Sequence, residues 1–317
     1  MLAVLALALA AACSAPGPRP TLPGSVTPAA DTLRVQVREN GRLVVRRVPL
    51  ERYVAAAILS EVAPPSADPR TLEAMFEVQA IISRTYAVSQ RGRHAQEGFD
   101  VCSTTHCQLY QPDRLRTSRW APAAEAAARQ TAGRLLWYDH APALALFHAD
   151  CGGGTSSAAA VWGGTALPYL VHEEDEGPAA AAHRTWRYEV RREALRSALN
   201  RDTRTAVGAR LERLEIRERD AAGRAERVAI IGARTIVVRG EVLREAIGRA
   251  LGARTVMSTL FDVRRTADGF LFEGRGFGHG VGLCQAGAYA RLQAGESPAD
   301  VLAFYFPGTS LASGLKP

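Results

Sequence analysis

Residues 50–90, LERYVAAAILSEVAPPSADPRTLEAMFEVQAIISRTYAVSQ, are the stretch around which the rest of the chain is expected to fold. Apolar side chains recur here at intervals of three and four residues, which is the spacing of one helix face. Pro64 and Pro65 interrupt the pattern, because proline lacks an N–H and clashes with the preceding helical turn. The stretch therefore predicts two helices. The positions in register are Leu50, Val54, Ala57 and Ile58 in the first helix and Leu72, Met75, Phe76, Gln79 and Tyr86 in the second.

Glu61 is an acidic residue at an apolar position. It follows Ile58 by three residues and so continues the apolar stripe of the first helix. A carboxyl group placed there loses water, which raises its pKa and favours the protonated form. A proton held near neutral pH is what a general acid requires. The alternative interpretation is a frayed helix end with Glu61 in solvent.

The composition is that of a globular protein with a basic surface. The 317 residues carry a formal charge of +7, and every basic residue except Lys316 is arginine. Because alanine is also abundant, we attribute the arginines to base composition rather than to selected phosphate contacts. No arginine-rich run with interleaved aromatic residues is present, which argues against nucleic acid. A basic surface suits an acidic partner such as a cell-wall polymer.

Residues 1–13 have the pattern of an export signal. MLAVLALALAAA is an apolar run too short to span a membrane as a mature helix, and Cys13 follows it. An apolar run, small residues, a cysteine and a flexible proline-rich linker (14–31) resemble a bacterial lipoprotein signal, in which the cysteine is lipidated. The alternative is an ordinary secretory signal. Both predict an exported protein of the cell envelope or periplasm, lipid-anchored at Cys13 in the first case.

Beyond the linker we expect one α+β domain, residues 32–310, with mixed helices and short antiparallel strands, followed by a tail at 311–317. Asn40-Gly41 predicts a hairpin turn within 32–49, because both residues accept positive φ. Residues 185–263 alternate short charged strands with two helices and predict an inserted α+β sub-domain with little chemistry. Further expected elements are a helix at 121–132, strands at 134–139 and 143–149, a surface excursion at 170–184, and a last helix that begins at Ser297-Pro298.

Three polar loops combine glycine with His, Cys or Gln: residues 98–112, 147–157 and 274–288. Loops on a rigid scaffold carry functional residues more often than other segments. Alternate glycines in the third loop would let the backbone approach a ligand closely, with His279 at the centre, although a tight structural turn is the alternative. We expect a groove where the three loops meet Glu61.

Four cysteines remain beyond Cys13, and three arrangements are open. In an exported protein they could form two disulfides. Cys and His side chains of the first two loops could instead bind zinc, or the thiols could be free. The adjacent His106 and Cys107 are expected to offer one ligand between them. The candidate metal set is Cys102, Cys107, His148 and Cys151, whereas Cys284 is expected to be a small core residue.

Motifs of several other enzyme classes are missing from the sequence. There is no dinucleotide fingerprint, no phosphate-binding loop with its lysine, no H-E-x-x-H and no G-x-S-x-G. A Cys–His nucleophile built on Cys107 or Cys151 stays open.

The blocks LSEVAP, QAIISRTYAV, FDVCSTTHCQLY, FHADCGGGTS, GRGFGHGVGLCQAGA and FYFPGT follow one another along the chain. In this order the chain resembles the SpoIID/LytB family, the stage II sporulation protein D type, from about residue 33 to 310. The resemblance implies work on peptidoglycan. Sporulation members of the family are lytic transglycosylases, which cleave between N-acetylmuramic acid and N-acetylglucosamine without water and leave a 1,6-anhydro end.

The resemblance also implies roles for individual residues. The family's catalytic acid is the glutamate after the first helix, which is Glu61 here. Some members carry zinc on Cys and His residues of the middle blocks, which would make the metal structural, and the chemistry itself requires no cofactor. The residues expected to hold the sugars or the developing charge are Arg84, Tyr86, His106, Gln108, His148, His279 and Gln285.

The resemblance leaves a rival function open. LytB-type relatives are modifiers that enhance an amidase. The chain would then bind glycan strands without cleaving them and assist an N-acetylmuramoyl-L-alanine amidase. The two functions differ on whether Glu61 is needed for bond cleavage.

Overall fold

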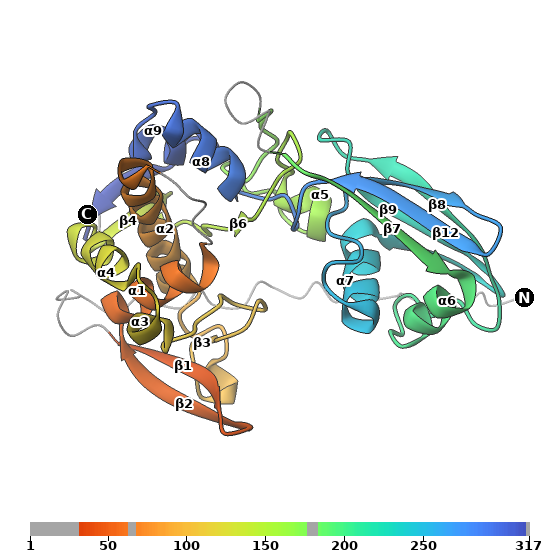
Figure 1. The fold of residues 1–317 in the computed structure, drawn as a ribbon, viewed down its shortest axis with the longest axis horizontal. Helices are drawn as coiled ribbons and strands as arrows, with labels where there is room; N and C mark the ends of the chain where they lie inside the picture. Colours follow the sequence, from red (N-terminus) through yellow and green to blue (C-terminus); the bar gives the residue numbers. More distant parts are fainter. Residues whose placement is uncertain (1–31, 63–67, 176–182, 315–317) are drawn as a thin grey trace, which may run out of the picture.

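The computed structural model describes residues 32–62, 68–175 and 183–314, which form two lobes (Figure 1). Each lobe has its own cluster of buried apolar side chains, one around the first two helices and one between the strands and helices of the second lobe. Helices and short, mostly antiparallel strands alternate in both lobes, which confirms the predicted α+β class.

The first lobe is built on the two predicted helices. Helix α1 (Leu50–Glu61) and helix α2 (Pro69–Ser89) begin and end close to the predicted bounds. Asp68 caps α2 by accepting a hydrogen bond of 3.0 Å from the Thr71 N–H, and Pro69 follows at the first helical position, where its missing N–H costs nothing. Pro64 and Pro65 lie outside the described residues. Phe76 is fully buried, and its replacement by alanine would cost about 3 to 5 kcal/mol.

A hairpin precedes the helices, as predicted. Strands β1 (Thr32–Glu39) and β2 (Arg42–Pro49) pair antiparallel, and Asn40 and Gly41 turn the chain with φ of 48° and 79°. A third strand, β3 (Val101–Cys102), pairs parallel with β1 and so anchors the first polar loop against the hairpin.

The remaining elements outside the second lobe include those that pack against α2, which are α4 (Ala121–Gln130), β4 (Arg134–Tyr138), β5 (Ala141–Pro142), α8 (Gln285–Gln293) and α9 (Pro298–Tyr305). The others are the short helical turn Ala95–Glu97, α3 (Arg114–Thr117), β6 (Phe147–His148), β13 (Leu283–Cys284), β14 (Ser310–Ser313) and α5 (Ala158–Trp162), of which α5 lies beside α7 (Gly240–Leu251) of the second lobe (Figure 1). The last helix starts at Ser297-Pro298, as predicted, with a reciprocal capping box between Ser297 and Asp300.

The second and third polar loops are held together by strand pairing. Strand β6 pairs parallel with β13, and isolated bridges join Asp150 to Phe277 and Ser156 to Val281. The close approach needs glycine, because a Cβ at Gly278, which has φ of +110°, would lie 2.8 Å from the Cβ of His148.

The second lobe contains two three-stranded sheets and two helices. Its elements are β7 (Thr185–Arg191), α6 (Arg192–Asn200), β8 (Leu211–Arg219), β9 (Ala225–Gly232), β10 (Thr235–Arg239), α7 (Gly240–Leu251), β11 (Phe261–Arg265) and β12 (Gly269–Arg275). The sheet orders are β10-β9-β8 and β11-β12-β7. Strand β12 lies beyond the predicted end at residue 263, so the lobe extends further along the chain than the expected sub-domain.

Three expectations differ from the structure. The tail expected at 311–317 instead begins with β14, which pairs antiparallel with β4. The strand expected at 143–149 is reduced to β6. The excursion expected at the surface over 170–184 includes Asp175, which is buried because Tyr305 and Arg291 bind its carboxylate. The predicted signal and linker, residues 1–31, lie outside the described residues, and no helix within the described residues is both long and apolar enough to cross a membrane.

Candidate functional site

Glu61 ends α1 and is held by two of the three polar loops. Its Oε1 accepts a hydrogen bond of 2.7 Å from the Leu109 N–H of the first loop. Its backbone carbonyl accepts a hydrogen bond of 3.4 Å from Nε2 of Gln285, which lies in the third loop and is the first residue of α8. The carboxyl group forms no ion pair with any of the described residues. The expected meeting of loops at Glu61 is therefore seen for the first and third loops, and strand β6 joins the second loop to the third.

Burial sets the charge of Glu61. Desolvation raises the pKa of its carboxyl from 4.5 to about 7, and the Leu109 N–H opposes this rise only in part. Because the side chain is half-buried rather than enclosed, the proton it holds near neutral pH is within reach of a ligand.

Buried amides fix the surroundings of Glu61. Gln285 Nε2 donates to Gln79 Oε1 at 3.1 Å, and Gln79 and Gln108 both donate to Ser83 Oγ, at 3.1 and 3.0 Å. Gln108 is buried, and its Oε1 has no partner among the described residues. Unpaired acceptors in the interior are costly, so this oxygen is a place for a water or ligand donor. The predicted residues Gln108 and Gln285 are thus linked to Glu61 by one hydrogen-bond network.

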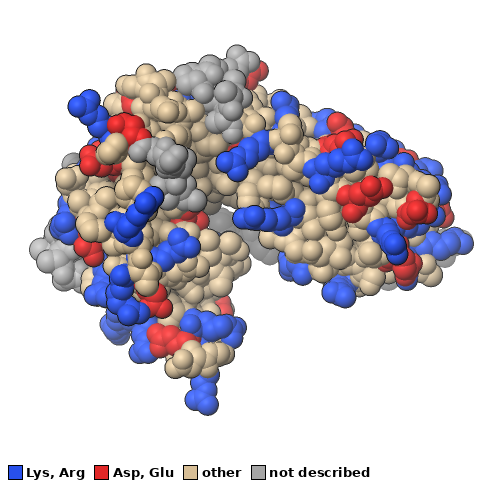
Figure 2. All heavy atoms as spheres, in the orientation of Figure 1, with Lys and Arg blue, Asp and Glu red and all other residues tan. Residues whose placement is uncertain are grey.

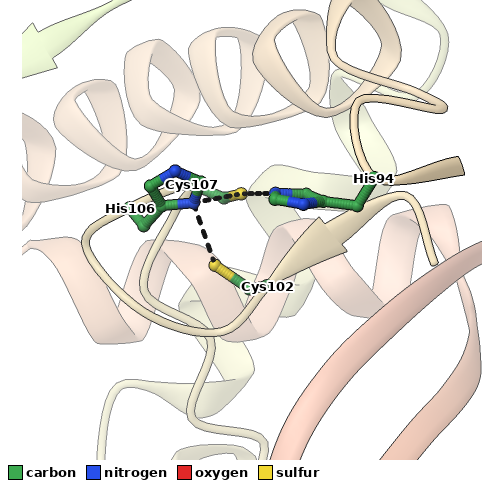
Figure 3. A group of neighbouring side chains, drawn as sticks. All are labelled: His94, Cys102, His106 and Cys107. Carbon is green, nitrogen blue, oxygen red and sulfur yellow. Dashed lines mark hydrogen bonds between the residues drawn. The ribbon is translucent and has the colours of Figure 1, made fainter. Parts of the chain in front are cut away.

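A cluster of Cys and His side chains lies in the first loop and the turn before it; we call it the loop cluster (Figure 3). It comprises His94, Cys102, His106 and Cys107, whose donor atoms all lie within 4.8 Å of one another. His94 Nε2 lies 3.4 Å from Cys107 Sγ, and His106 Nδ1 lies 3.7 and 3.6 Å from the two sulfur atoms. A tetrahedral zinc ion with bonds of about 2.0 to 2.3 Å places its ligands about 3.3 to 3.8 Å apart. The donor set and its spacing therefore fit a zinc ion.

The carboxylate of Glu97 completes the loop cluster from outside. Its Oε1 lies 2.5 Å from His94 Nδ1, which leaves Nε2 directed at Cys107. A carboxylate behind a metal-ligating imidazole fixes the ring and its tautomer. The sequence reasoning missed His94, and it expected only one donor from His106 and Cys107, whereas both side chains face the cluster (Figure 3).

The predicted metal set is not one site. Cys102 and Cys107 belong to the loop cluster, whereas Cys151 groups with Asp150, His183 and Cys284, and His148 belongs to neither group. All four cysteines of the described chain are free. Cys284 is buried, as predicted. Cys151 is fully buried as well, and the pKa of its thiol is raised by the hydrogen bond with Cys284 and by burial, which argues against a nucleophile there.

His148 and His279 form a neutral pair. Their ring centroids lie 5.5 Å apart, and the ring of Trp162, which is 43% exposed, lies 5.1 Å from that of His279. Burial lowers the pKa of His279 to about 4 and holds the pKa of His148 well below its ordinary value. His148 Nε2 is buried without a partner among the described residues. At neutral pH these rings can exchange hydrogen bonds with a ligand but carry no charge.

Arg84 and Tyr86 are not placed for contact with a ligand. The Arg84 side chain is 0% exposed, and its guanidinium binds the Glu51 carboxylate and the Ala128 carbonyl. This makes Arg84 a packing residue, which corrects the expectation that it lines a groove. The Tyr86 hydroxyl is buried, accepts a hydrogen bond of 3.3 Å from Arg93, and has a pKa raised to about 12 by desolvation.

The molecular surface is basic in a dispersed way. Figure 2 shows arginine side chains over both lobes, interspersed with acidic ones, and a notch in the outline between the lobes. Two hollows lie elsewhere: one of about 550 Å³ lined by residues of β7, β11 and β12, and one of about 390 Å³ lined by residues of α1, α3 and α4. Neither contains a predicted site residue, so the buried polar network around Glu61 defines the candidate site better than these hollows do.

Comparison with known proteins finds two matched regions in the chain. Residues 38–138, which contain Glu61 and the loop cluster, match the family model of the stage II sporulation protein SpoIID. Residues 177–282, nearly the second lobe, match a Domain of unknown function (DUF8618). The family model and the relatives described next therefore support the SpoIID/LytB family for this chain.

Its relatives match over most of the chain. Stage II sporulation protein D of Bacillus subtilis (strain 168) is 28% identical over 309 residues, covering 93% of this chain and 83% of that protein. Stage II sporulation protein D of Bacillus amyloliquefaciens is 26% identical, covering 93% and 82%. The amidase enhancer of Bacillus subtilis (strain 168) is 25% identical over 77% of this chain, but the match spans only 38% of that protein.

Proposed function

We propose that the protein is a peptidoglycan lytic transglycosylase in which Glu61 acts as the single acid and base. The observation that carries the proposal is the Glu61 carboxyl itself, with a pKa raised to about 7 and one oxygen held by the Leu109 N–H. A general acid works best when its pKa lies near the pH of reaction.

The reaction uses one carboxyl group twice. Glu61 gives its proton to the glycosidic oxygen between N-acetylmuramic acid and N-acetylglucosamine, the C1–O bond breaks, and an oxocarbenium-like centre develops at C1. The carboxylate then takes the proton of the muramic acid C6 hydroxyl, whose oxygen attacks C1 and closes the 1,6-anhydro ring. Hydrolysis would need a second carboxylate at about 5 to 9.5 Å. Glu61 forms no ion pair with the described residues, so no cation favours its ionised form and the carboxyl keeps the proton that the first step needs.

The buried polar groups of this lobe would support the glycan site from within. Gln108 Oε1 and His148 Nε2 are buried acceptors without partners among the described residues, and ordered water can satisfy such groups. Gln285 holds the Glu61 carbonyl and so positions the helix end rather than the substrate.

A metal at the loop cluster would be structural. His94, Cys102, His106 and Cys107 would hold it, and it would supply rigidity to the loop that carries Leu109. The chemistry at Glu61 needs no step at that site.

The test is the mass of the products released from peptidoglycan, with and without its stem peptides. Wild type and the matched control Glu73→Gln, an exposed carboxyl on α2, should release anhydromuramic ends, and Glu61→Gln should release none. Cleavage by the wild type should fall as pH rises above about 7, because Glu61 then loses its proton. Reducing ends, or an active Glu61→Gln variant, would overturn the proposal.

A second candidate function is supported by the amidase enhancer among the relatives. The protein would then bind glycan strands in the cell envelope and assist a cell-wall amidase without cleaving the glycan itself. In the same experiment this function predicts glycan binding without cleavage by both wild type and Glu61→Gln. It also predicts faster peptide release when either protein is added to a cell-wall amidase. Lipid anchoring at Cys13 would serve either function and is tested by the mass of the mature N-terminal peptide.

A further inference from the structure

A second group of metal-type donors lies inside the protein, apart from the loop cluster. Asp150, Cys151, His183 and Cys284 offer donor atoms that all lie within 4.8 Å of one another; we call them the interior cluster. They come from the loop after β6, the residues before β7 and the end of β13. Strand pairing between β6 and β13 brings these segments together.

The spacing of the interior cluster is close to that of ligands around one ion. Both ring nitrogens of His183 lie 3.9 Å from Cys151 Sγ, and Asp175 Oδ2 lies 3.3 Å from the same sulfur. The ligands of a tetrahedral zinc ion are about 3.3 to 3.8 Å apart. Cys151, Cys284 and His183 thus offer three ligands, whereas the Asp175 carboxylate, which Tyr305 and Arg291 bind, contacts the group at the Cys151 sulfur.

The outer contacts of the interior cluster match those of a metal site. Asp150 Oδ1 lies 2.7 Å from His183 Nδ1, and Asp150 also accepts the N–H groups of Gly152 and Arg184. The carboxylate therefore holds the ring, as Glu97 does for His94 in the loop cluster, while Nε2 lies 3.3 Å from the Asp175 carbonyl, a contact that a bound metal would replace.

Two backbone N–H groups would stabilise negative charge on the sulfur of Cys284. It accepts the Cys151 N–H at 3.1 Å and the Gly287 N–H at 3.3 Å, the second from the first turn of α8. N–H donors directed at sulfur are a recurrent outer contact of metal-bound thiolates.

The charge of the buried Arg224 guanidinium also favours thiolates in the interior cluster. Arg224 is 1% exposed, donates to the Cys151 carbonyl, and has Nε and Nη1 without partners among the described residues. A buried guanidinium is costly unless negative charge lies nearby, and the Asp220 and Glu241 carboxylates supply part of that charge. Two thiolates at Cys151 and Cys284 would add to it, and a divalent cation would offset their mutual repulsion.

We propose that the interior cluster is a second structural metal site for zinc, held by Cys151, Cys284 and His183 and oriented by Asp150. It ties the third polar loop to the segment that enters the second lobe. This site is independent of the glycan chemistry proposed above. A Cys–His nucleophile is a weaker interpretation of the same residues, because the fully buried Cys151 sulfur is closed to a substrate.

The experiment is metal counting on the purified full chain, loaded with zinc and dialysed. Wild type should retain about two zinc ions per chain, and Cys102→Ser/Cys107→Ser should retain about one, because that pair of changes removes only the loop cluster. Cys284→Ser should also retain about one. Cobalt titration of Cys102→Ser/Cys107→Ser should then give sulfur-to-cobalt charge-transfer absorption, which reads the interior cluster without needing a variant of it.

Two results would overturn the second site. The first is a Cys102→Ser/Cys107→Ser protein that is folded but holds no zinc and gives no cobalt absorption. The second is an intact mass about 2 Da below that of the reduced chain, with Cys151 and Cys284 recovered in one cross-linked peptide, since that would identify a disulfide.

Discussion

Replacing Glu61 with glutamine should stabilise the protein, and by an amount that depends on pH. A carboxyl group whose pKa is 4.5 in the unfolded chain and about 7 in the folded protein holds its proton more tightly when folded. The folded state is therefore penalised wherever the unfolded chain would already be ionised. The penalty is absent below pH 4.5, grows as pH rises, and is complete above pH 7.

The magnitude follows from the two pKa values. The change from 4.5 to about 7 corresponds to about 3 kcal/mol at pH 8 and to about 1.4 kcal/mol at pH 5.5. Glutamine keeps an oxygen that can accept the Leu109 N–H, so the variant loses the ionisation penalty without losing that hydrogen bond. The free energy of unfolding of Glu61→Gln should thus exceed that of wild type by about 2 to 3 kcal/mol at pH 8 and by almost nothing at pH 4.

Urea unfolding at pH 4, 5.5, 7 and 8 measures this difference. Fluorescence and circular dichroism should be followed together, because the two lobes have separate hydrophobic clusters and need not unfold in one step. Glu73→Gln, an exposed carboxyl on α2, is the matched control and should show no such trend. Equal stabilities of wild type and Glu61→Gln at pH 8 would refute the reasoning, because Glu61 would then ionise in the folded protein as easily as in the unfolded chain.

Three further predictions concern packing and metal. Gly287→Ala should lower stability by about 2 kcal/mol although alanine favours helices, because its Cβ would lie 2.2 Å from Tyr305 Oη. Gly248→Ala in α7 should instead raise stability by about 1 kcal/mol, because the nearest atom to its Cβ is 3.9 Å away. Equal effects of the two changes would contradict the packing argument. Arg84→Met should cost about 3 kcal/mol, because the Glu51 carboxylate and buried carbonyls lose their donor; a stability equal to that of wild type by urea unfolding would show that the buried pair contributes nothing. Chelation of zinc-loaded wild-type protein should lower its melting temperature. In Cys102→Ser/Cys107→Ser the same treatment should cause a smaller decrease, because only the metal of the interior cluster is then lost. An unchanged melting temperature in both proteins would exclude structural metal.

Much of the local structure follows from short stretches of sequence. Helices α1 and α2 begin and end near the predicted residues, because the 3.6-residue period and the Asp68-Pro69 helix start depend only on residues close together in the sequence. The Asn40-Gly41 turn and the strands of the second lobe are predictable for the same reason, since turn geometry and strand alternation are local. The position of Glu61 on an apolar stripe was sufficient to single it out.

Side-chain environments were not predictable in this way. Arg84 was expected in a groove, but Glu51, 33 residues away, takes its guanidinium in the interior. His94 carries no signature beside the cysteines, and it reaches Cys107 only because the turn before β3 folds back over the first loop. Asp175, in a stretch that looked like a surface excursion, is buried because Tyr305, 130 residues away, meets its carboxylate.

The sequence by itself determined the elements, the acidic residue at the end of α1 and the family blocks in their order, because each depends on residues near one another in the chain. The tertiary structure alone decided which donors share a site. Cys151 and Cys284 are 133 residues apart, and pairing of β6 with β13 places their sulfur atoms in one cluster, whereas Cys102 and Cys107 lie in another. Propensity acts over a few residues, but burial, pKa and ligand geometry depend on what the fold brings opposite each side chain.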